Sequence, residues 1–278
     1  MGGAELHAHT TESDGTFTPA EAVRHAVSIG LEALAVTDHD SMGAVPAAAD
    51  SAEGTDLRII PGVEISCLHN GGPVHMLGYW ADPAHEELAA ELERVRESRR
   101  TRAARMVELL RGLGHPVELD RVLAFAQGAS PGRPHVAQAL VEAGVVRTVN
   151  DAFVPELIGT GGQAYVEKYC LVPEHAVRLV RDAGGVAVLA HPGLHRGTKP
   201  VPDEVIRSLA EAGLAGLEAD HFDHPPEQAA RFRVLAAELG LVATAGSDCH
   251  GTLYDPVRMG TCRTSLETVA ALEARRPQ

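Results

Sequence analysis

Residues 33–40 read ALAVTDHD, a short apolar run that ends directly in two aspartates and a histidine. The run Ala33–Thr37 has the composition of a buried strand, whereas the polar residues after it are typical of a strand end. The same succession, an apolar run followed by a histidine or a carboxylate, recurs along the chain. The segments between these runs have the spacing of helices.

This alternation predicts a parallel sheet or barrel and not a sandwich. Two helix starts are well marked. Thr18-Pro19-Ala20-Glu21 combines a capping box with proline at the first helical position, and Thr264-Ser265-Leu266-Glu267 repeats the capping box. We predict seven strands, near Ala4–His7, Ala33–Thr37, Arg58–Ile65, Val74–Tyr79, Val186–Ala190, Leu214–Ala219 and Leu241–Ala245.

The alternation stops between Asp82 and about Ala164. The segment Glu86–Arg111 is rich in Glu, Arg and Leu, with apolar residues near helical spacing, and Arg133–Ala143 has the pattern of another helix. We therefore expect a barrel formed by residues 1–81 and 165–278. Residues 82–164 are expected to form an all-helical insertion that acts as a lid or a substrate-specificity element.

Polar residues follow or interrupt every predicted strand. In an α/β barrel the reacting residues lie at the C-terminal ends of the strands, because these ends and their loops meet on one open face. Imidazole nitrogens and carboxylate oxygens suit Mn, Fe or Zn, so we predict a site for several metal ions. In chain order the residues are His7, His9 and Asp14, then Asp38, His39 and Asp40, then Glu64, His75 and His191, then Glu218, Asp220 and His221, and finally Asp248 and His250.

Several of these residues form motifs that resemble those of the PHP (polymerase and histidinol phosphatase) superfamily. The motifs are His7-x-His9, Thr37-Asp38-His39, Gly62-x-Glu64, His75, His191-Pro192 and Ser247-Asp248-x-His250-Gly251, in this order. The resemblance implies a distorted seven-stranded (β/α) barrel that binds two to three divalent metal ions, with Mn expected first and Fe or Zn as alternatives. The implied metal ligands are His7, His9, Asp14, His39, Glu64, His75, His191, Asp248 and His250, of which Asp14, His39, His191 and Asp248 are also expected to act in catalysis.

The insertion and the run Gly132-Arg133-Pro134-His135 resemble a bacterial branch of this superfamily. That branch removes the 3′-phosphate from nucleoside 3′,5′-bisphosphates and trims short oligonucleotides from the 5′ end. Arg133 and His135 are expected to bind a substrate phosphate, because a helix N-terminus, a guanidinium and an imidazole would lie together there. His221 and His224 are further substrate-contact candidates in loops, where we expect them to be solvated.

The expected reaction is the hydrolysis of a phosphate monoester of a nucleotide-like small molecule. A hydroxide bridging two metal ions would be the nucleophile, because metal coordination lowers the pKa of water towards ~7. The sequence has no nucleophile elbow and no reactive cysteine motif. The alternatives are a 5′-3′ exonuclease acting on short oligonucleotides, a histidinol-phosphate-type phosphatase and, outside the enzymes, a metal-stabilised accessory module.

The charge composition of the chain restricts the classes of binding partner that we expect. Lys and Arg number 24 against 38 Asp and Glu, a formal net charge of −14, so the protein surface repels phosphate backbones and anionic membranes. We expect a small phosphorylated substrate, with no stable nucleic-acid partner and no membrane association. The start of the chain lacks the pattern of a signal peptide, and we expect a cytoplasmic protein. The four cysteines form no CxxC pair, which argues against a structural zinc knuckle.

Overall fold

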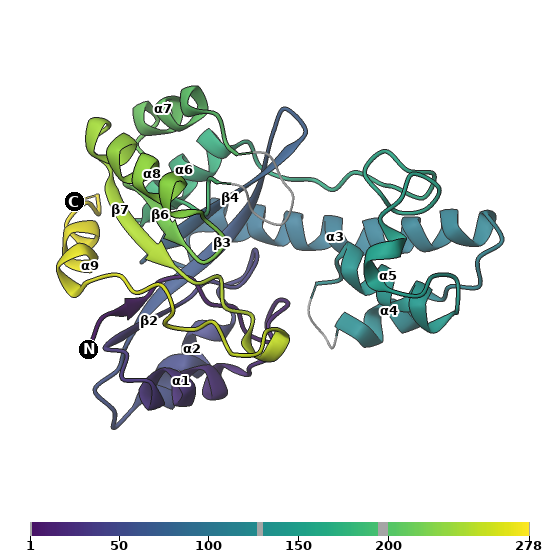
Figure 1. Ribbon diagram of the computed structural model, residues 1–278, viewed down its shortest axis with the longest axis horizontal. Helices are drawn as coiled ribbons and strands as arrows, with labels where there is room; N and C mark the ends of the chain where they lie inside the picture. The colour runs from purple at the N-terminus through teal and green to yellow at the C-terminus, as the bar shows by residue number, and fades with distance from the viewer. Residues whose placement is uncertain (1, 127–129, 194–199, 278) are drawn as a thin grey trace. The chain divides into compact units, whose positions relative to one another are not determined.

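The computed structural model describes residues 2–126, 130–193 and 200–277. The chain divides into two compact units. The first unit contains residues 1–92 and 170–278, and the second contains residues 93–169. Figure 1 shows a sheet with helices around it in the first unit and a group of helices in the second.

One mixed sheet forms the centre of the first unit. Within the described residues it has seven strands, and each strand lies beside its neighbour in the sequence, in the order β1 to β7. The β1–β2, β2–β3, β5–β6 and β6–β7 pairs are parallel, whereas β4 is antiparallel to both β3 and β5. The strands are β1 (Ala4–Glu5), β2 (Ala33–Val36), β3 (Arg58–His69), β4 (Gly72–Tyr79), β5 (Val186–Leu189), β6 (Gly216–His221) and β7 (Val242–Gly246).

The first and last strands of the sheet come together and nearly close it into a barrel. The backbone N–H of His9 donates to the carbonyl of Cys249 (2.8 Å), and the N–H of Cys249 donates to the carbonyl of His7 (3.1 Å). These bonds form a parallel bridge between Ala8 and Cys249, just beyond the ends of β1 and β7. The expected distorted seven-stranded barrel is confirmed.

Strand β4 corrects the expectation of a parallel sheet. The turn between β3 and β4 is centred on Asn70 and Gly71, both with positive φ (48° and 78°). Such a tight turn has no room for a crossover helix, so the next strand must return antiparallel. β4 therefore begins at the edge where β3 ends, and His75 pairs with Ser66. His75 thus lies at the C-terminal edge of the parallel strands although it is near the start of its own strand.

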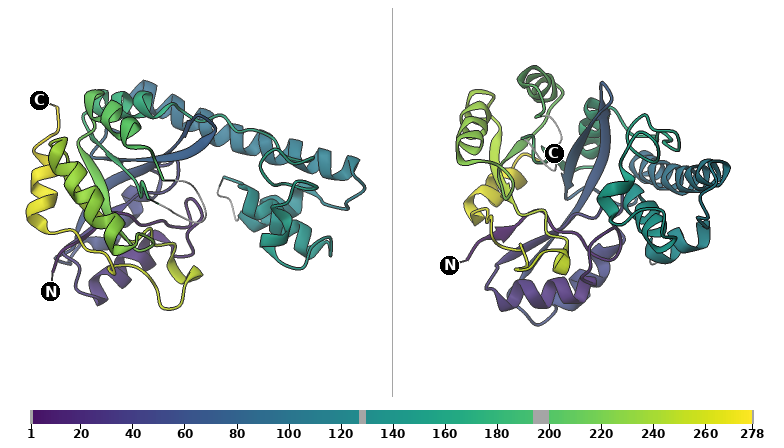
Figure 2. Two further views of the ribbon diagram at one scale, coloured as in Figure 1. Left: turned by 45° about the horizontal axis from the view of Figure 1, so that its top comes forward. Right: turned by 45° about the vertical axis from the view of Figure 1, so that its right-hand side comes forward.

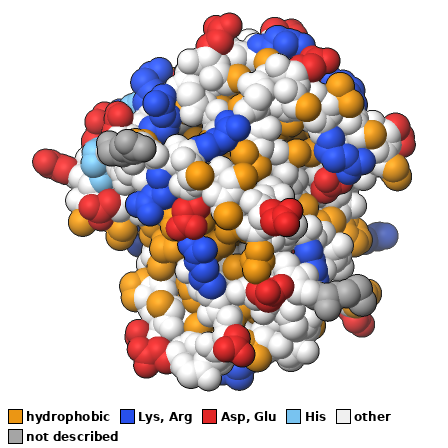
Figure 3. Space-filling model, turned by 90° about the vertical axis from the view of Figure 1, so that its left-hand side faces the viewer, with side chains coloured by type: hydrophobic (Ala, Val, Ile, Leu, Met, Phe, Trp, Pro, Cys, Tyr) orange, Lys and Arg blue, Asp and Glu red, His pale blue; other side chains and the backbone are white. Residues whose placement is uncertain are grey.

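Helices flank the sheet (Figure 2). On the face seen in Figure 3, acidic and basic side chains are interspersed, with hydrophobic side chains between them. The first unit contains the start of α3 and six further helices among its described residues. These are α1 (Pro19–Ser28), α2 (Ala44–Ala52), α6 (Pro173–Asp182), α7 (Asp203–Glu211), α8 (Pro226–Glu238) and α9 (Leu266–Glu273), together with the short 3₁₀ helix η2 (Gly251–Leu253).

The two predicted capping boxes behave differently. At α1, Thr18 accepts from the N–H of Glu21 and the Glu21 carboxylate accepts from the N–H of Thr18, as expected. At α9 the cap is Ser265, whose side chain accepts from the N–H of Thr268. Thr264 is instead buried, and its hydroxyl bonds to Ala245 of β7. The expected second capping box is therefore wrong: α9 has a single N-cap at Ser265, and Thr264 helps to fix the last strand instead.

The barrel core consists mainly of buried aliphatic side chains, together with Tyr79 and Trp80. Tyr79 of β4 is fully buried, and its hydroxyl donates to the carbonyl of Leu6 (2.8 Å). A second cluster packs α1 and α2 against the sheet and includes Ala8 and Cys249. Ala8 lies between His7 and His9, and Cys249 lies between Asp248 and His250. These two side chains pack in the core, which holds the backbone that carries the site.

The described part of the second unit is helical and has a core of its own. Its helices are the remainder of α3 (Glu86–Gly112), then α4 (Leu119–Ala126), α5 (Arg133–Glu142) and the 3₁₀ helix η1 (Val149–Ala152). Met106, Leu110, Val136 and Leu140 are buried together in this core. The expected helices of the insertion are thus present.

No helix in the described ranges is both long and apolar enough to cross a membrane.

Candidate metal centre

Glu64 lies at the centre of a cluster of imidazoles. It is carried by β3 and is almost completely buried. Its two carboxylate oxygens lie within 3.4 Å of ring nitrogens of five histidines, which come from four segments of the barrel. Oε1 contacts His75 Nδ1 (2.9 Å), His191 Nε2 (3.1 Å) and His7 Nε2 (3.4 Å), and Oε2 contacts His39 Nδ1 (2.9 Å) and His9 Nε2 (3.1 Å).

Asp248 and Asp14 add carboxylates to the same cluster. Oδ1 of Asp248, which follows β7, lies 3.2 Å from His9 Nε2 and 3.5 Å from His7 Nε2. Asp14 Oδ1 lies 3.2 Å from His250 Nε2. Glu64 and Asp248 therefore face the same place, as a shared metal site requires.

The structure brings together all nine residues that the sequence proposes as metal ligands. Eight of them form three groups whose ligand atoms lie within 4.8 Å of one another, and His191 joins them through Glu64. The first group is His9, Asp14, His39 and His250, the second is His7, His9, Glu64 and Asp248, and the third is His39, Glu64 and His75.

The donor atoms of this cluster fit metal ions. Among the described residues, Nε2 of His7, Nε2 of His9, Nδ1 of His39 and Oε2 of Glu64 are buried without a hydrogen-bond partner, although several lie only about 3 Å apart. They converge on common points without the alignment that a hydrogen bond needs. Buried polar atoms left this way cost free energy, and a cation bound between them removes that cost.

The electrostatics of the cluster keep its carboxylates ionised. Burial alone would raise the pKa of Glu64, but the imidazoles of His39, His75 and His7 outweigh burial and hold it well below its usual range. Conversely, burial would lower the pKa of His9, but Asp248 and Glu64 raise it to about 10. The negative charge of the ionised carboxylates must therefore be balanced by positive charge. Protons on the imidazoles can provide it, and metal ions compete with these protons for the same nitrogen atoms.

Glu218 supports the cluster from behind, a role that the sequence analysis did not assign. It lies in β6 with its side chain buried. Nδ1 of His7 donates to both of its oxygens (3.1 and 3.2 Å), and the backbone N–H of His191 donates to Oε2 (2.8 Å). A carboxylate in a buried strand needs such partners, and that requirement was the available signal.

Three other buried acids hold the loops that carry the cluster. Asp38 accepts from the backbone and hydroxyl of Thr10 and from Ser13. Asp40 accepts from the backbone and hydroxyl of Ser66, opposite His75. Glu5 accepts from Ser247, the residue before Asp248. These acids set the backbone positions of the metal-site residues.

The backbone at this edge is strained. Asp40, His191 and Asp248 have φ values of 55°, 24° and 48°, in the region that favours glycine. Such conformations cost free energy and persist where the surroundings enforce them, often at functional sites.

The structure corrects the expectation that His221 and His224 are solvated, because both are buried. The ring of His221 lies 5.3 Å from that of His191, and burial lowers its pKa to about 3. His224 accepts from the N–H of Gly193 at Nε2 (3.1 Å) and donates from Nδ1 to the carbonyl of Ala219 (2.9 Å). His224 therefore links the loop after β5 to β6.

Arg133 and His135 lie at the first turn of α5, as expected. Nδ1 of His135 accepts from the N–H of Gly132 (3.0 Å), so the imidazole caps the helix. Arg133 donates to Thr160 Oγ1 (3.3 Å) and lies over the rings of Phe153 and Tyr165.

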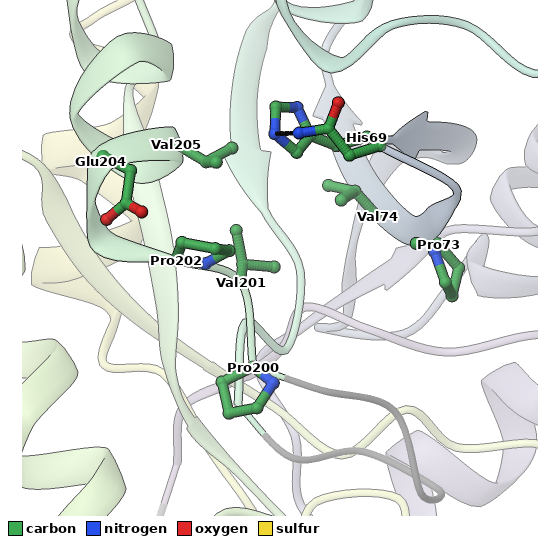
Figure 4. A pocket seen from close by; sticks show the side chains of 10 residues that line it. His69, Pro73, Val74, Pro200, Val201, Pro202, Glu204 and Val205 are labelled. Atoms are coloured by element: carbon green, nitrogen blue, oxygen red, sulfur yellow. Dashed lines mark hydrogen bonds between the residues drawn. The ribbon is translucent and has the colours of Figure 1, made fainter.

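A separate pocket of about 500 Å³ lies between the β3–β4 hairpin and the start of α7 (Figure 4). Proline and valine side chains such as Pro73, Val74 and Val201 form most of its wall, with His69 and Glu204 at its margins. Among the described residues that line it there is no lysine or arginine. The cluster around Glu64 is therefore a better candidate than this pocket for the site of phosphate chemistry.

Comparisons with known proteins agree with this site. The profile of the PHP domain family matches residues 5–123. The 5′-3′ exoribonuclease Rnm of Salmonella typhimurium is 34% identical over 248 residues, which cover 88% of this chain and 84% of that protein. The 3′,5′-nucleoside bisphosphate phosphatase of Chromobacterium violaceum is 33% identical over 251 residues, covering 90% and 88%. A structure from Bifidobacterium adolescentis, assigned as a metal-dependent phosphoesterase, has a TM-score of 0.89 at 35% identity and covers 100% of this chain and 97% of that one.

The barrel and its buried cluster of histidines and carboxylates define a metal-dependent phosphoesterase. The chain belongs to the PHP family. It is therefore an enzyme that hydrolyses phosphate esters with the help of divalent metal ions, and the non-enzymatic alternative is set aside.

Proposed function

We propose that this enzyme hydrolyses a phosphate monoester of a nucleotide-like small molecule, with the 3′-phosphate of a nucleoside 3′,5′-bisphosphate as the first candidate. The observation that carries the proposal is the convergence of nine histidine and carboxylate side chains around Glu64. The similarity to the C. violaceum bisphosphate phosphatase supports the choice of substrate.

The residues of the cluster divide into an inner and an outer part. His7, His9 and Glu64 are buried, whereas Asp14 is 40% exposed and His75 is 23% exposed. The inner residues hold their positions through the core and through Glu218, and the outer residues face the side from which a phosphate can enter. When bound, divalent ions lower the pKa of water and offset the charge of the phosphoryl group.

We further propose two to three ions, with Mn first and Fe or Zn as alternatives. The three overlapping groups of ligand atoms support this number. Mixed imidazole and carboxylate ligands suit these metals better than Ca²⁺ or Mg²⁺, which prefer oxygen alone. Metal analysis of the purified protein, expressed without added metal, measures both identity and number.

We propose that Arg133 and His135 bind the substrate phosphate that is not hydrolysed, so that the helical unit confers specificity. Arg96 and Arg121 pair with glutamates, whereas Arg133 has no carboxylate partner among the described residues. Its guanidinium is held by a hydroxyl and by aromatic rings, which leaves its charge available to an anion.

A second candidate function is 5′-3′ exonucleolytic cleavage of short oligonucleotides. The similarity to the Salmonella exoribonuclease favours it. The same metal cluster can serve both reactions, and the net charge of −14 favours the small substrate.

A substrate screen in Mn²⁺ tests these proposals. It compares nucleoside 3′,5′-bisphosphates, mononucleotides, histidinol phosphate and short oligonucleotides by phosphate release and product length. The main proposal expects the bisphosphate to have the highest kcat/KM. A higher kcat/KM for oligonucleotides would favour the exonuclease, and one for histidinol phosphate would overturn both.

A further inference from the structure

Three side chains form a stacked cluster in the loops that follow β6 and β7. The guanidinium carbon of Arg258 lies 4.0 Å from the centre of the Phe222 ring and 3.6 Å from that of Tyr254. Arg258 also lies 3.5 Å from the carboxylate of Asp223. Its side chain is only 13% exposed, so the guanidinium is fixed between its neighbours.

This cluster is connected to the metal centre through its own loops. Phe222 directly follows His221, whose ring packs against that of His191. The backbone N–H of Asp223 donates to Nδ1 of His221 (3.1 Å), so the start of this loop is fixed against the site. Tyr254 follows the 3₁₀ turn η2, which begins directly after His250. Phe222 and Tyr254 therefore lie in the loops that follow His221 and His250.

Phe222 is an exposed aromatic side chain. It is 48% exposed and is the one aromatic residue among the large hydrophobic side chains that the described residues leave exposed. The neighbouring Leu253 is also exposed, at 58%. An aromatic ring held by a fixed guanidinium and open to solvent provides a flat apolar surface at low entropic cost.

We propose that Phe222 is a stacking surface for the base of a nucleotide substrate, with Arg258 as the positioning residue that fixes its ring. This inference rests on the proposed function, because it requires a substrate with a base. Aromatic side chains bind nucleobases by stacking without selecting among them, since every base has a π face. The site should therefore favour nucleotides over sugar phosphates and discriminate little between bases.

The first experiment compares a nucleoside 3′,5′-bisphosphate with ribose 3,5-bisphosphate, which lacks the base. Phe222→Ala should lower kcat/KM for the nucleotide about tenfold, mainly through KM, and leave the ribose bisphosphate within twofold. Phe222→Trp should restore the nucleotide activity. Val234→Ala, which removes an exposed side chain on α8, is the matched control and should change neither value.

Equal losses of kcat/KM on the two substrates would overturn the proposal, because Phe222 would then act on the sugar phosphate or on the fold. No loss on either substrate would overturn it as well. Arg258→Lys keeps the charge but loses the planar group, and it should reduce the preference for the nucleotide while leaving the ribose bisphosphate unchanged.

A binding measurement separates this inference from the proposed function. Calorimetry compares adenosine 5′-monophosphate with ribose 5-phosphate on the metal-loaded protein, whatever ester the enzyme hydrolyses. The wild type should bind the nucleotide about tenfold more tightly, and Phe222→Ala should bind both alike. If the wild type itself binds both alike, the stacking surface is wrong even if the enzyme hydrolyses bisphosphates. If the wild type prefers the nucleotide and Phe222→Ala loses this preference, the stacking surface is supported even if the enzyme does not hydrolyse bisphosphates.

Discussion

Glu218 shows how one buried carboxylate fixes two parts of the metal centre. It accepts from Nδ1 of His7 and from the backbone N–H of His191. Bonding at Nδ1 leaves Nε2 of His7 without a proton in the neutral ring, directed at Glu64 and Asp248. Both contacts of Glu218 therefore orient groups that face the cluster.

We expect Glu218→Gln to lower metal affinity and activity about 10- to 100-fold, because an amide accepts more weakly than a carboxylate and provides one oxygen instead of two. Metal titration followed by kcat at saturating Mn²⁺ measures the two effects separately. Glu211→Gln, on the exposed end of α7, is the control for the loss of a negative charge. Unchanged metal affinity in Glu218→Gln would show that the hydrogen bonds to His7 do not tune the site.

At the scale of single residues, the sequence predicts which residues belong to the site better than it predicts their burial and hydrogen-bond partners. The family resemblance indicated all nine proposed ligands, and eight of them also follow closely or lie within a short apolar run, whereas Asp14 lies in a polar stretch. The burial of His224 could not be predicted from the sequence, because it depends on hydrogen bonds that link the loop at Gly193 to Ala219 of β6, and these segments are distant in sequence. Glu218 was visible as an acid in a strand, but its partner His7 is 211 residues away.

Among the elements, β4 departs most from the sequence-based expectation. All seven predicted strands are present, with ends displaced by up to four residues. The direction of β4 depended on the two-residue turn at Asn70-Gly71, and strand composition alone does not encode it. The reversal has a functional consequence, because it brings His75 to within 2.9 Å of Glu64.

The contact between α6 and β4 provides a test of the packing. A methyl group added at Gly78 would lie 2.8 Å from Val180 of α6 and 3.2 Å from Val63 of β3. We expect Gly78→Ala to lower the free energy of unfolding by about 1–3 kcal/mol, measured by urea denaturation, because the core there is already filled.

Gly112→Ala is the control for this change. Gly112 ends α3, and an added methyl group there would meet no atom within 4 Å. Alanine has the higher helix propensity, so stability should be unchanged or slightly increased. A Gly78→Ala protein as stable as the wild type would mean that α6 can move away from the sheet at little cost.

For the molecule as a whole, the net charge of the chain and the charge of the metal-loaded site are expected to differ in sign. The chain carries a net charge of −14, and the buried cluster includes the carboxylates of Glu64, Asp248 and Asp14. Bound divalent ions would reverse the sign locally, while the acidic remainder discourages extended polyanions. A small phosphate ester would therefore be attracted to one point of the surface.

Chelation should abolish hydrolysis, and Mn²⁺ should restore it, whereas thiol alkylation should leave it largely intact. Cys67 and Cys249 are buried, and burial raises the pKa of the Cys249 and Cys262 thiols to about 11, so little thiolate is present at neutral pH. Phosphate release after exhaustive chelation, and again after iodoacetamide treatment, measures both effects. Activity that survives chelation would contradict the metal-dependent mechanism.

The proposed role of Arg133 leads to a further prediction. A bisphosphate carries one phosphate that reacts and one that must be held elsewhere. We expect Arg133→Ala to lower kcat/KM about 10²-fold for a nucleoside bisphosphate, about 2.7 kcal/mol, and to leave a simple aryl phosphate nearly unchanged. Arg121→Ala removes an arginine of the same unit that is already paired with Glu142, and it should affect neither substrate.

The losses of kcat/KM on the two substrates distinguish the possible roles of Arg133 in the helical unit, because each role involves a different part of the substrate. A loss confined to the bisphosphate means that Arg133 binds the second phosphate, as proposed. Equal losses on both substrates would mean that Arg133 serves the reacting phosphate or the fold, and a thermal melt separates these two cases. No loss on either would remove Arg133 from substrate binding, and the specificity of the enzyme would then have to arise within the barrel unit itself.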